Sequence, residues 1–357
     1  MRLGISSPLT HADPAEWARR HKSLGLEVIN FPLNCESDPA LIDAYANEAA
    51  ANGLAIAEVG VWKNAMAVDQ EEREKALRFA IGQLELADRL GAACCVNILG
   101  SKGPRWDGAY KENFSRETWK QGVAMIREVI DAVRPSNTYF TIESMPWMYP
   151  TGPDEYLQLL EEVDRDRFAV HLDLFNWITS PQRYFYNEEF ADECFEKLGK
   201  YVKSCHLKNV RLEEDYTLQL KETDPEGGGV SIPHLVRRAE SYDSAMPFII
   251  EHLDSDKAYL DSIAYVKSIT GKVCRGTQVP DLHPDDYRAG YHGSGFPSAV
   301  QPAGNAAGSV RQAASWNHRR LAVQSADRAL CPDERRDLGI YRYELYPLFR
   351  GNEPDRP

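Results

Sequence analysis

The chain has 357 residues, of which 43% are hydrophobic, and it carries a formal net charge of −13. The negative charge argues against nucleic acid as a partner, because binding to a phosphate backbone needs clustered lysine and arginine. No apolar run reaches the roughly 20 residues of a membrane span, and no signal-peptide pattern opens the chain. The seven cysteines are irregularly spaced without a CxxC pair. We therefore expect a cytoplasmic protein with reduced thiols and no membrane partner.

From residue 1 to about residue 273, short apolar runs alternate with longer amphipathic stretches. Asp13 and Asp38 each precede a proline at a predicted first helical position, and Gly25 and Gly53 stand where these helices must stop. The remaining helix-like stretches follow the same amphipathic pattern. The eight runs predicted to be strands are 2–6, 26–31, 54–61, 94–99, 139–143, 168–174, 202–207 and 248–253.

Eight strands that alternate with about eight helices predict parallel pairing with right-handed crossovers. Two architectures fit this order, a closed (β/α)₈ TIM barrel and an open doubly wound sheet. The count of eight over residues 1–273 is typical of a barrel. The first strand is not followed by GxGxxG, which weakens the dinucleotide-binding open sheet. We therefore predict an α/β fold of the (β/α)₈ TIM-barrel type for residues 1–273.

The alternation of apolar runs and amphipathic stretches ends in the last part of the chain. Residues 274–357 are rich in Gly, Pro, Ser, Ala and Arg without any period. Such a composition cannot bury enough apolar surface to offset the entropy of ordering. We predict a disordered C-terminal tail, with a functional tail as the alternative.

Four successive predicted strands end in residues with metal-ligand chemistry. They are Glu143 on the fifth strand, Asp173 on the sixth, His206 on the seventh and Glu251 on the eighth. In a (β/α)₈ barrel these ends meet at the face that carries the active site. Three crowded carboxylates would raise one another's pKa, and a divalent cation removes that repulsion. Three carboxylates and one imidazole suit Mn²⁺, Mg²⁺ or Co²⁺, with Zn²⁺ as an alternative.

The order Glu143, Asp173, His206, Glu251 resembles the xylose-isomerase-like TIM-barrel superfamily, and within it the sugar isomerase/epimerase branch. The resemblance covers residues 1–273. It implies that the four residues hold one divalent ion, for which Mn²⁺ is our first expectation. It also implies that Glu143 and Glu251 flank a keto sugar or polyol and exchange protons with adjacent carbons through an enediolate.

The resemblance leaves the reaction open among three outcomes. Return of a proton to the opposite face gives epimerisation, and return to the neighbouring carbon gives isomerisation. Loss of a β-hydroxyl makes the protein a lyase, similar to inosose dehydratases or to enzymes that eliminate from a 3-keto sugar. A metal-binding accessory protein without catalysis is the remaining alternative. Barrels of this kind commonly form homo-oligomers.

The sequence departs from the pattern of ketose 3-epimerases in two places. Asn176 stands where those enzymes commonly carry a histidine three residues after the metal aspartate. Lys208 and Arg211 follow His206 at a spacing different from that of the usual arginine. Lys208 is a candidate for binding a carboxylate or oxyanion near the metal, and a surface lysine is the alternative. The apurinic-site endonuclease branch needs further histidines, and Asn176 and Asn97 occupy two of those positions.

Further candidates for substrate contact lie near the same strand ends. Trp147 and Trp62 follow the fifth and third strands and could stack on a sugar ring, with loop packing as the alternative. Asn97 on strand four is a candidate polar contact. Alternation places His171 on the same face as Asp173, so it is a candidate contact from one layer below the site, with a packed core residue as the alternative. Alternation also predicts that His252 points outward toward the helices.

Overall fold

The computed structural model describes residues 1–271 of the chain. The tail predicted for residues 274–357 lies outside the described residues, and the boundary at residue 273 stays a prediction. Five cysteines, Cys35, Cys94, Cys95, Cys194 and Cys205, fall in the described part, and all five are free thiols. None of the helices within residues 1–271 has the length and apolar character needed to cross a membrane.

Eight parallel strands form one sheet in the order β1-β10-β7-β6-β5-β4-β3-β2. The first and last strands of this order approach each other where Glu27 N–H donates to Leu3 C=O at 2.9 Å, so the sheet is a nearly closed barrel. The predicted (β/α)₈ architecture is confirmed. The barrel strands are β1 Arg2–Ile5, β2 Val28–Asn30, β3 Ala55–Gly60, β4 Cys94–Asn97, β5 Phe140–Glu143, β6 Phe168–Leu172, β7 Val202–Leu207 and β10 Pro247–Ile250.

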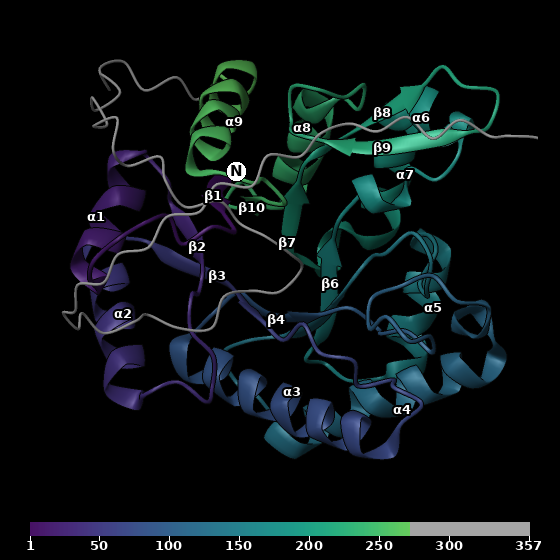
Figure 1. Ribbon diagram of the computed structural model, residues 1–357, viewed down its shortest axis with the longest axis horizontal. Helices are drawn as coiled ribbons and strands as arrows, with labels where there is room; N and C mark the ends of the chain where they lie inside the picture. Colours follow the sequence, from purple (N-terminus) through teal and green to yellow (C-terminus); the bar gives the residue numbers. More distant parts are fainter. Residues whose placement is uncertain (272–357) are drawn as a thin grey trace, which may run out of the picture. The chain divides into compact units, whose positions relative to one another are not determined.

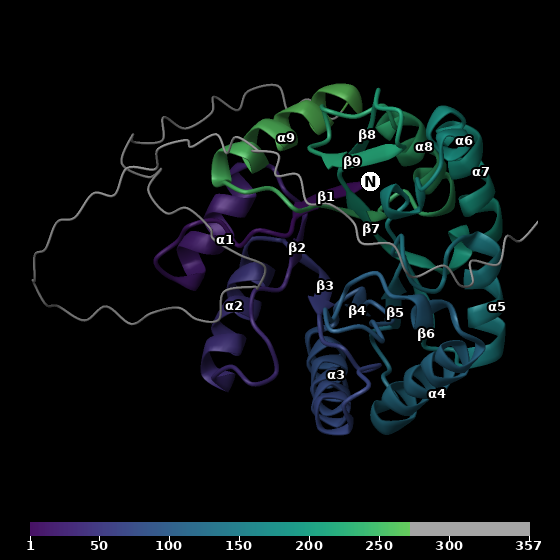
Figure 2. The same cartoon turned by 45° about the vertical axis from the view of Figure 1, so that its right-hand side comes forward.

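Helices surround the strands, as Figures 1 and 2 show from two directions. The predicted helix starts are found: the Asp13 and Asp38 carboxylates accept hydrogen bonds from Glu16 N–H and Ala40 N–H. Such caps stabilise a helix by about 1 kcal/mol each. The helices are α1 Pro14–Ser23, α2 Pro39–Ala51, α3 Gln70–Leu90, α4 Arg116–Val133, α5 Pro153–Val163, α6 Pro181–Phe185, α7 Asn187–Leu198, α8 Ile232–Tyr242 and α9 Asp256–Ile269.

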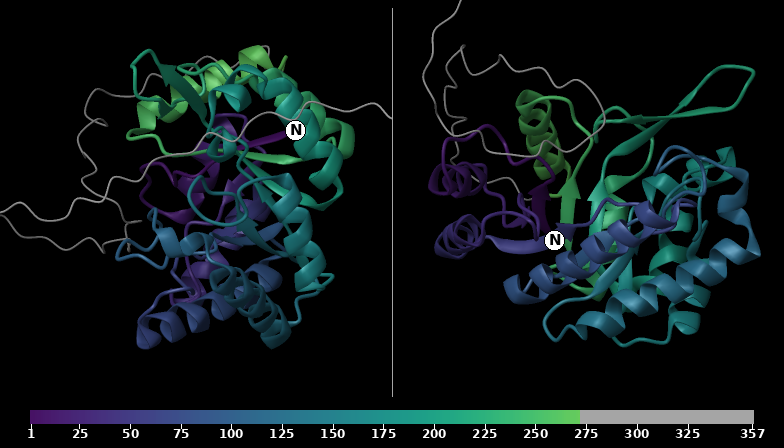
Figure 3. Two further views of the ribbon diagram at one scale, coloured as in Figure 1. Left: turned by 90° about the vertical axis from the view of Figure 1, so that its right-hand side faces the viewer. Right: turned by 60° about the horizontal axis from the view of Figure 1, so that its bottom comes forward.

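One element departs from the predicted rhythm. A two-stranded antiparallel hairpin, β8 Asn209–Glu213 and β9 Gln219–Thr223, lies between β7 and α8. It follows the C-terminal end of β7 directly and extends away from the barrel strands in the right-hand view of Figure 3. The hairpin therefore begins at the face of the barrel where the predicted site residues lie.

Candidate metal and catalytic site

The four strand-end residues predicted from the sequence come together. Glu143 ends β5, Asp173 follows β6, His206 lies in β7 and Glu251 follows β10. Each offers a ligand-type atom, these atoms all lie within 4.8 Å of one another, and all four residues are buried. We call this set the four-residue cluster.

His206 is the centre of the cluster. Its Nδ1 lies 2.8 Å from Glu251 Oε2 and 3.2 Å from Glu143 Oε1. Burial lowers the pKa of His206, but the charges of Glu251, Glu143 and Glu58 outweigh burial and hold it well above the usual value. One imidazole nitrogen is therefore directed at the two glutamates that the sequence analysis paired.

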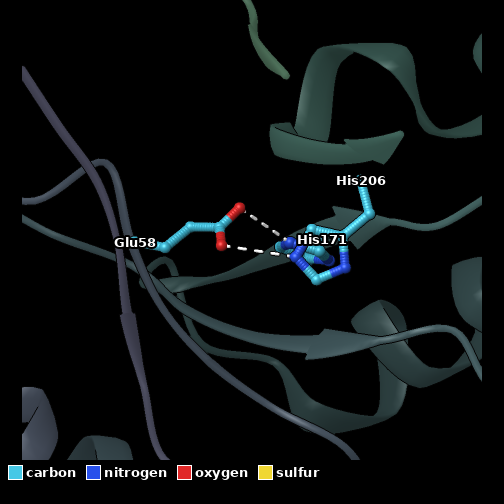
Figure 4. A group of neighbouring side chains, drawn as sticks. All are labelled: Glu58, His171 and His206. Atoms are coloured by element: carbon cyan, nitrogen blue, oxygen red, sulfur yellow. Dashed lines mark hydrogen bonds and ion pairs between the residues drawn. The ribbon is translucent and has the colours of Figure 1, made fainter. Parts of the chain in front are cut away.

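Glu58, on β3, holds the other side of His206 and was missed as a site residue in the sequence. Its side chain is completely buried. One carboxylate oxygen, Oε2, lies 3.3 Å from His206 Nε2, and the other, Oε1, lies 2.9 Å from His171 Nε2 and accepts from Ser204 Oγ. Figure 4 shows Glu58 reaching both rings from the opposite side of the barrel interior. The sequence signal was a charged residue inside the apolar run of strand three.

Glu58, His171 and His206 form a second group with metal-ligand chemistry, again within 4.8 Å. Both Glu58 oxygens are already paired with ring nitrogens, and the two rings are in edge contact at 4.2 Å between centroids. Burial raises the pKa of Glu58, but the two histidines outweigh burial and lower it strongly. This group therefore acts as a hydrogen-bonded support that orients His206, as carboxylates beneath metal-bound histidines do. His171 lies one layer below the four-residue cluster, as alternation predicted, and its substrate contact stays a prediction.

Lys208 is buried beside the cluster, with 1% of its surface exposed. Its Nζ lies 2.7 Å from Asp173 Oδ2, 2.8 Å from Glu251 Oε1 and 3.3 Å from Glu222 Oε2. Burial lowers the pKa of Lys208, but Asp173 and Glu251 outweigh burial and raise it well above the usual value. The surface-lysine alternative is wrong, because the ammonium lies among carboxylates at the site.

The three carboxylates of the cluster differ in how well the surrounding charges stabilise their ionised forms. Burial raises the pKa of Asp173 to about 7, against the opposing effect of Lys208. Burial also acts to raise the pKa of Glu251 and of Glu143, but His206 outweighs it in both, and their pKa values lie below the usual range. Asp173 is thus the ligand-type carboxylate whose charge is least stabilised by the protein.

The donor set fits a divalent cation. Three carboxylates and one imidazole nitrogen converge from four strands, and such oxygen-rich sets suit hard or borderline ions. Asp173 Oδ2 is buried and makes no hydrogen bond within residues 1–271, although Lys208 lies within ion-pair distance. A buried carboxylate oxygen is costly unless a partner compensates its charge; Lys208 provides one such partner, and a divalent ion would provide the same compensation. The residues that could hold the ion are Glu143, Asp173, His206 and Glu251.

The hairpin and the residue after Glu251 form one rim of the site. Glu222 on β9 reaches Lys208, and its Oε1 lies 2.9 Å from His252 Nδ1. The prediction that His252 points outward to the helices is wrong. The strand ends at Ile250, and His252 has a positive φ of 57°, so strand alternation no longer applies. The Glu251 charge raises the pKa of His252 to about 9.

A cavity of about 430 Å³ lies between the β9 side of this rim and α9, with acidic side chains on both walls. Its polar lining consists of Glu222, Thr223, Asp224, Glu226, His252, Asp254, Asp261, Ser262 and Tyr265.

Two predicted substrate contacts lie next to the four-residue cluster. Asn176 donates from Nδ2 to Glu143 Oε1 at 3.3 Å, and its N–H donates to Asp173 Oδ1 at 3.2 Å. Asn176 therefore positions two of the ligand-type carboxylates. The ring of Trp62 lies 6.5 Å from that of His206 between centroids, at an interplanar angle of 32°. This places an aromatic ring beside the cluster.

Two other residues predicted to contact the substrate form hydrogen bonds with loop backbone groups. Asn97 is fully buried, and its amide donates to Lys63 C=O at 3.0 Å and accepts from Lys63 N–H at 3.4 Å. Asn97 thus fixes the loop that carries Trp62. Trp147 donates from Nε1 to Asp107 C=O, which gives it a loop-packing role. Contact of either residue with a substrate stays a prediction.

Comparison with known proteins agrees with the barrel fold. A family model described as xylose isomerase-like TIM barrel matches residues 8–269. A search of curated proteins found no match.

Several solved structures share the fold, at low sequence identity. A probable 3-DHS dehydratase, AsbF, from Bacillus anthracis has a TM-score of 0.59 at 16% identity, covering 76% of this chain and 99% of its own. D-psicose 3-epimerase from Clostridium cellulolyticum H10, solved with D-tagatose, has a TM-score of 0.57 at 14% identity, covering 76% and 99%. A xylose isomerase-like TIM barrel protein from Mycobacterium smegmatis, in complex with magnesium, has a TM-score of 0.56 at 19% identity, covering 76% and 96%.

Proposed function

Because the chain belongs to the xylose isomerase-like TIM barrel family, we propose that it is a divalent-metal-dependent isomerase or epimerase of a keto sugar or related polyol. One observation carries the proposal: two glutamates, Glu143 and Glu251, converge on one nitrogen of His206 within a buried set of metal-ligand residues. Mn²⁺ is the ion that we propose, with Mg²⁺, Co²⁺ and Zn²⁺ as alternatives.

A divalent ion held by the four-residue cluster would supply Lewis-acid polarisation of a substrate carbonyl. The protein's own groups would move the protons. Both oxygens of Glu251 have partners, Oε1 with Lys208 and Oε2 with His206. Glu143 uses Oε1 toward His206 and Asn176, and its Oε2 has no hydrogen bond or ion pair to any residue among 1–271. We assign Glu143 as the base that removes the proton α to the carbonyl, with Glu251 on the other side of the substrate.

Solvent proton exchange tests this assignment. The full-length protein is incubated with Mn²⁺ and a panel of ketoses and keto-inositols in D₂O, and deuterium incorporation is followed by NMR. We expect exchange without loss of water, and a drop of about 10² to 10⁴-fold in Glu143→Gln, the usual contribution of a positioned base. Exchange that is undiminished in Glu143→Gln would remove the assigned base. Absence of exchange with every compound would favour the non-catalytic accessory role.

A dehydratase is the second candidate, and Lys208 is the observation that favours it. An ammonium 2.8 Å from Glu251 is a charged donor placed beside one of the two proton-transfer carboxylates. Such a donor could assist departure of a β-hydroxyl as water. The same substrate panel separates the two reactions, because elimination produces an absorbance rise from a conjugated carbonyl and epimerisation does not.

A further inference from the structure

Lys208 shares its partners with the proposed metal site. Asp173 and Glu251 belong to the four-residue cluster, and each directs one oxygen at the Lys208 ammonium, at 2.7 and 2.8 Å. The lysine is two residues after His206 on the same chain segment, so strand alternation places both side chains toward the same interior. The ammonium is therefore a cation already in contact with two of the four ligand-type residues.

A divalent ion and the ammonium would meet strong mutual repulsion at this distance. Two positive charges a few ångströms apart, in a pocket shielded from water, repel far more than they would at an exposed surface. Asp173 Oδ2 and Glu251 Oε1 already face the ammonium, so an ion bound by the cluster would have to share these two carboxylates with Lys208. Binding of the ion and retention of the Lys208 contacts therefore oppose each other.

The hairpin offers the ammonium another partner. Glu222 Oε2, on β9, lies 3.3 Å from Lys208 Nζ, and the Glu222 side chain is 42% exposed. A small rotation of the flexible lysine stem would strengthen this pairing while releasing Asp173 and Glu251. Glu222 would then be shared, with Oε2 toward the ammonium and Oε1 toward His252 Nδ1, which lies 2.9 Å away.

We propose that Lys208 is an internal counter-cation that competes with the divalent ion for Asp173 and Glu251 and moves toward Glu222 when the ion binds. Lys208 would thereby set the metal affinity of the site. It would also deliver a positive charge to the substrate only in the metal-loaded protein. This inference rests on the proposed metal-dependent function.

Calorimetric titration with Mn²⁺ tests the competition. Full-length wild type is compared with Lys208→Met and with the control Lys203→Met. Lys203 lies on the same strand, but its ammonium packs over the Tyr139 ring at 4.4 Å. We expect Lys208→Met to bind Mn²⁺ at least tenfold more tightly than wild type, and Lys203→Met to match wild type. Lys208→Gln serves in the same comparison if the methionine variant does not fold.

A labelling experiment on wild type tests the movement without any substitution. Acetylation of Lys208 by acetic anhydride is quantified by mass spectrometry with and without Mn²⁺. The buried ammonium should react slowly without the ion and several-fold faster with it, while Lys203 labels equally in both. If Mn²⁺ binds to wild type but neither tightens in Lys208→Met nor exposes Lys208, this inference fails and the metal site stands. If neither wild type nor Lys208→Met binds Mn²⁺, both the inference and the proposed function fail.

Discussion

Glu58→Gln gives the sharpest test of how the site is built. The substitution keeps the shape of the side chain and removes the charge beneath His206, from which Glu58 Oε2 lies 3.3 Å. The variant retains an amide that can still bond to one ring, so folding is expected to survive. What should change is the orientation and basicity of the His206 ring, and hence its strength as a ligand.

The size of the effect follows from that contact. Two full charges 3.3 Å apart interact by about 5 kcal/mol at an effective dielectric constant of about 20, which sets a ceiling. A hydrogen bond to a charged group contributes about 1.5–3 kcal/mol. Loss of a carboxylate beneath a metal-bound histidine typically weakens metal affinity about 10 to 100-fold, which equals about 1.4–2.7 kcal/mol. The two independent ranges agree, so we expect a loss of that size.

Equilibrium dialysis against Mn²⁺, with the metal measured by mass spectrometry, provides the dissociation constants. Ser204→Ala is the matched control, because Ser204 donates to Glu58 Oε1 and makes no hydrogen bond to His206 among the described residues. We expect its affinity to fall less than that of Glu58→Gln. A Glu58→Gln protein that folds and binds Mn²⁺ within threefold of wild type would refute the idea that Glu58 supports the metal ligand.

Three further predictions concern the surroundings of the site. Asn209→Ala should lower the free energy of unfolding, measured in urea, by about 2–4 kcal/mol. The buried Asn209 amide makes hydrogen bonds to four backbone groups at the base of the hairpin, two of them on Val230. A loss below about 1 kcal/mol would contradict this reasoning. Trp62→Ala should raise KM for the exchanging ketose about tenfold with little change in kcat, and equal KM values would exclude stacking. Burial lowers the pKa of His21, so the contribution of this residue to the free energy of unfolding is present above pH 6.5 and decreases on acidification. The slope of this decrease is at most about 1.4 kcal/mol per pH unit. The His21→Gln variant should lack this decrease in a series of unfolding curves measured at falling pH.

The grouping of residues at the strand ends could be predicted from the sequence, because it follows from two general rules. Apolar runs mark parallel strands, and barrel topology brings their C-terminal ends to one face. Glu143, Asp173, His206 and Glu251 needed no further information to be grouped. The bounds of the strands were less certain at their ends, because apolar residues such as Leu99 continue past the last ladder hydrogen bonds.

The hairpin could not be predicted in the same way. Residues 209–223 carry six charged side chains, which is typical of a solvated loop. The hairpin forms because Asn209 closes its base with buried hydrogen bonds and because Glu222 meets Lys208 and His252. Those partners are distant in sequence, so no local pattern contains them. The burial of Lys208 likewise depends on Asp173 and Glu251, which come from other strands.

The site thus consists of two layers that differ in how freely they can change. Below, Glu58, His171 and Ser204 are fully buried and interlocked, so a substitution there would disturb His206 and any reaction that depends on it. Above, Glu222 and His252 lie on a partly exposed rim, where we expect a substitution to alter contacts with the proposed substrate at smaller cost to the fold. If related proteins kept the lower layer and differed in the rim, the same four-residue cluster could serve epimerisation in some of them and dehydration in others. Lys208 connects the two layers, because it touches Asp173 and Glu251 of the four-residue cluster and the rim residue Glu222. Its position is therefore where we expect the choice of reaction to be made.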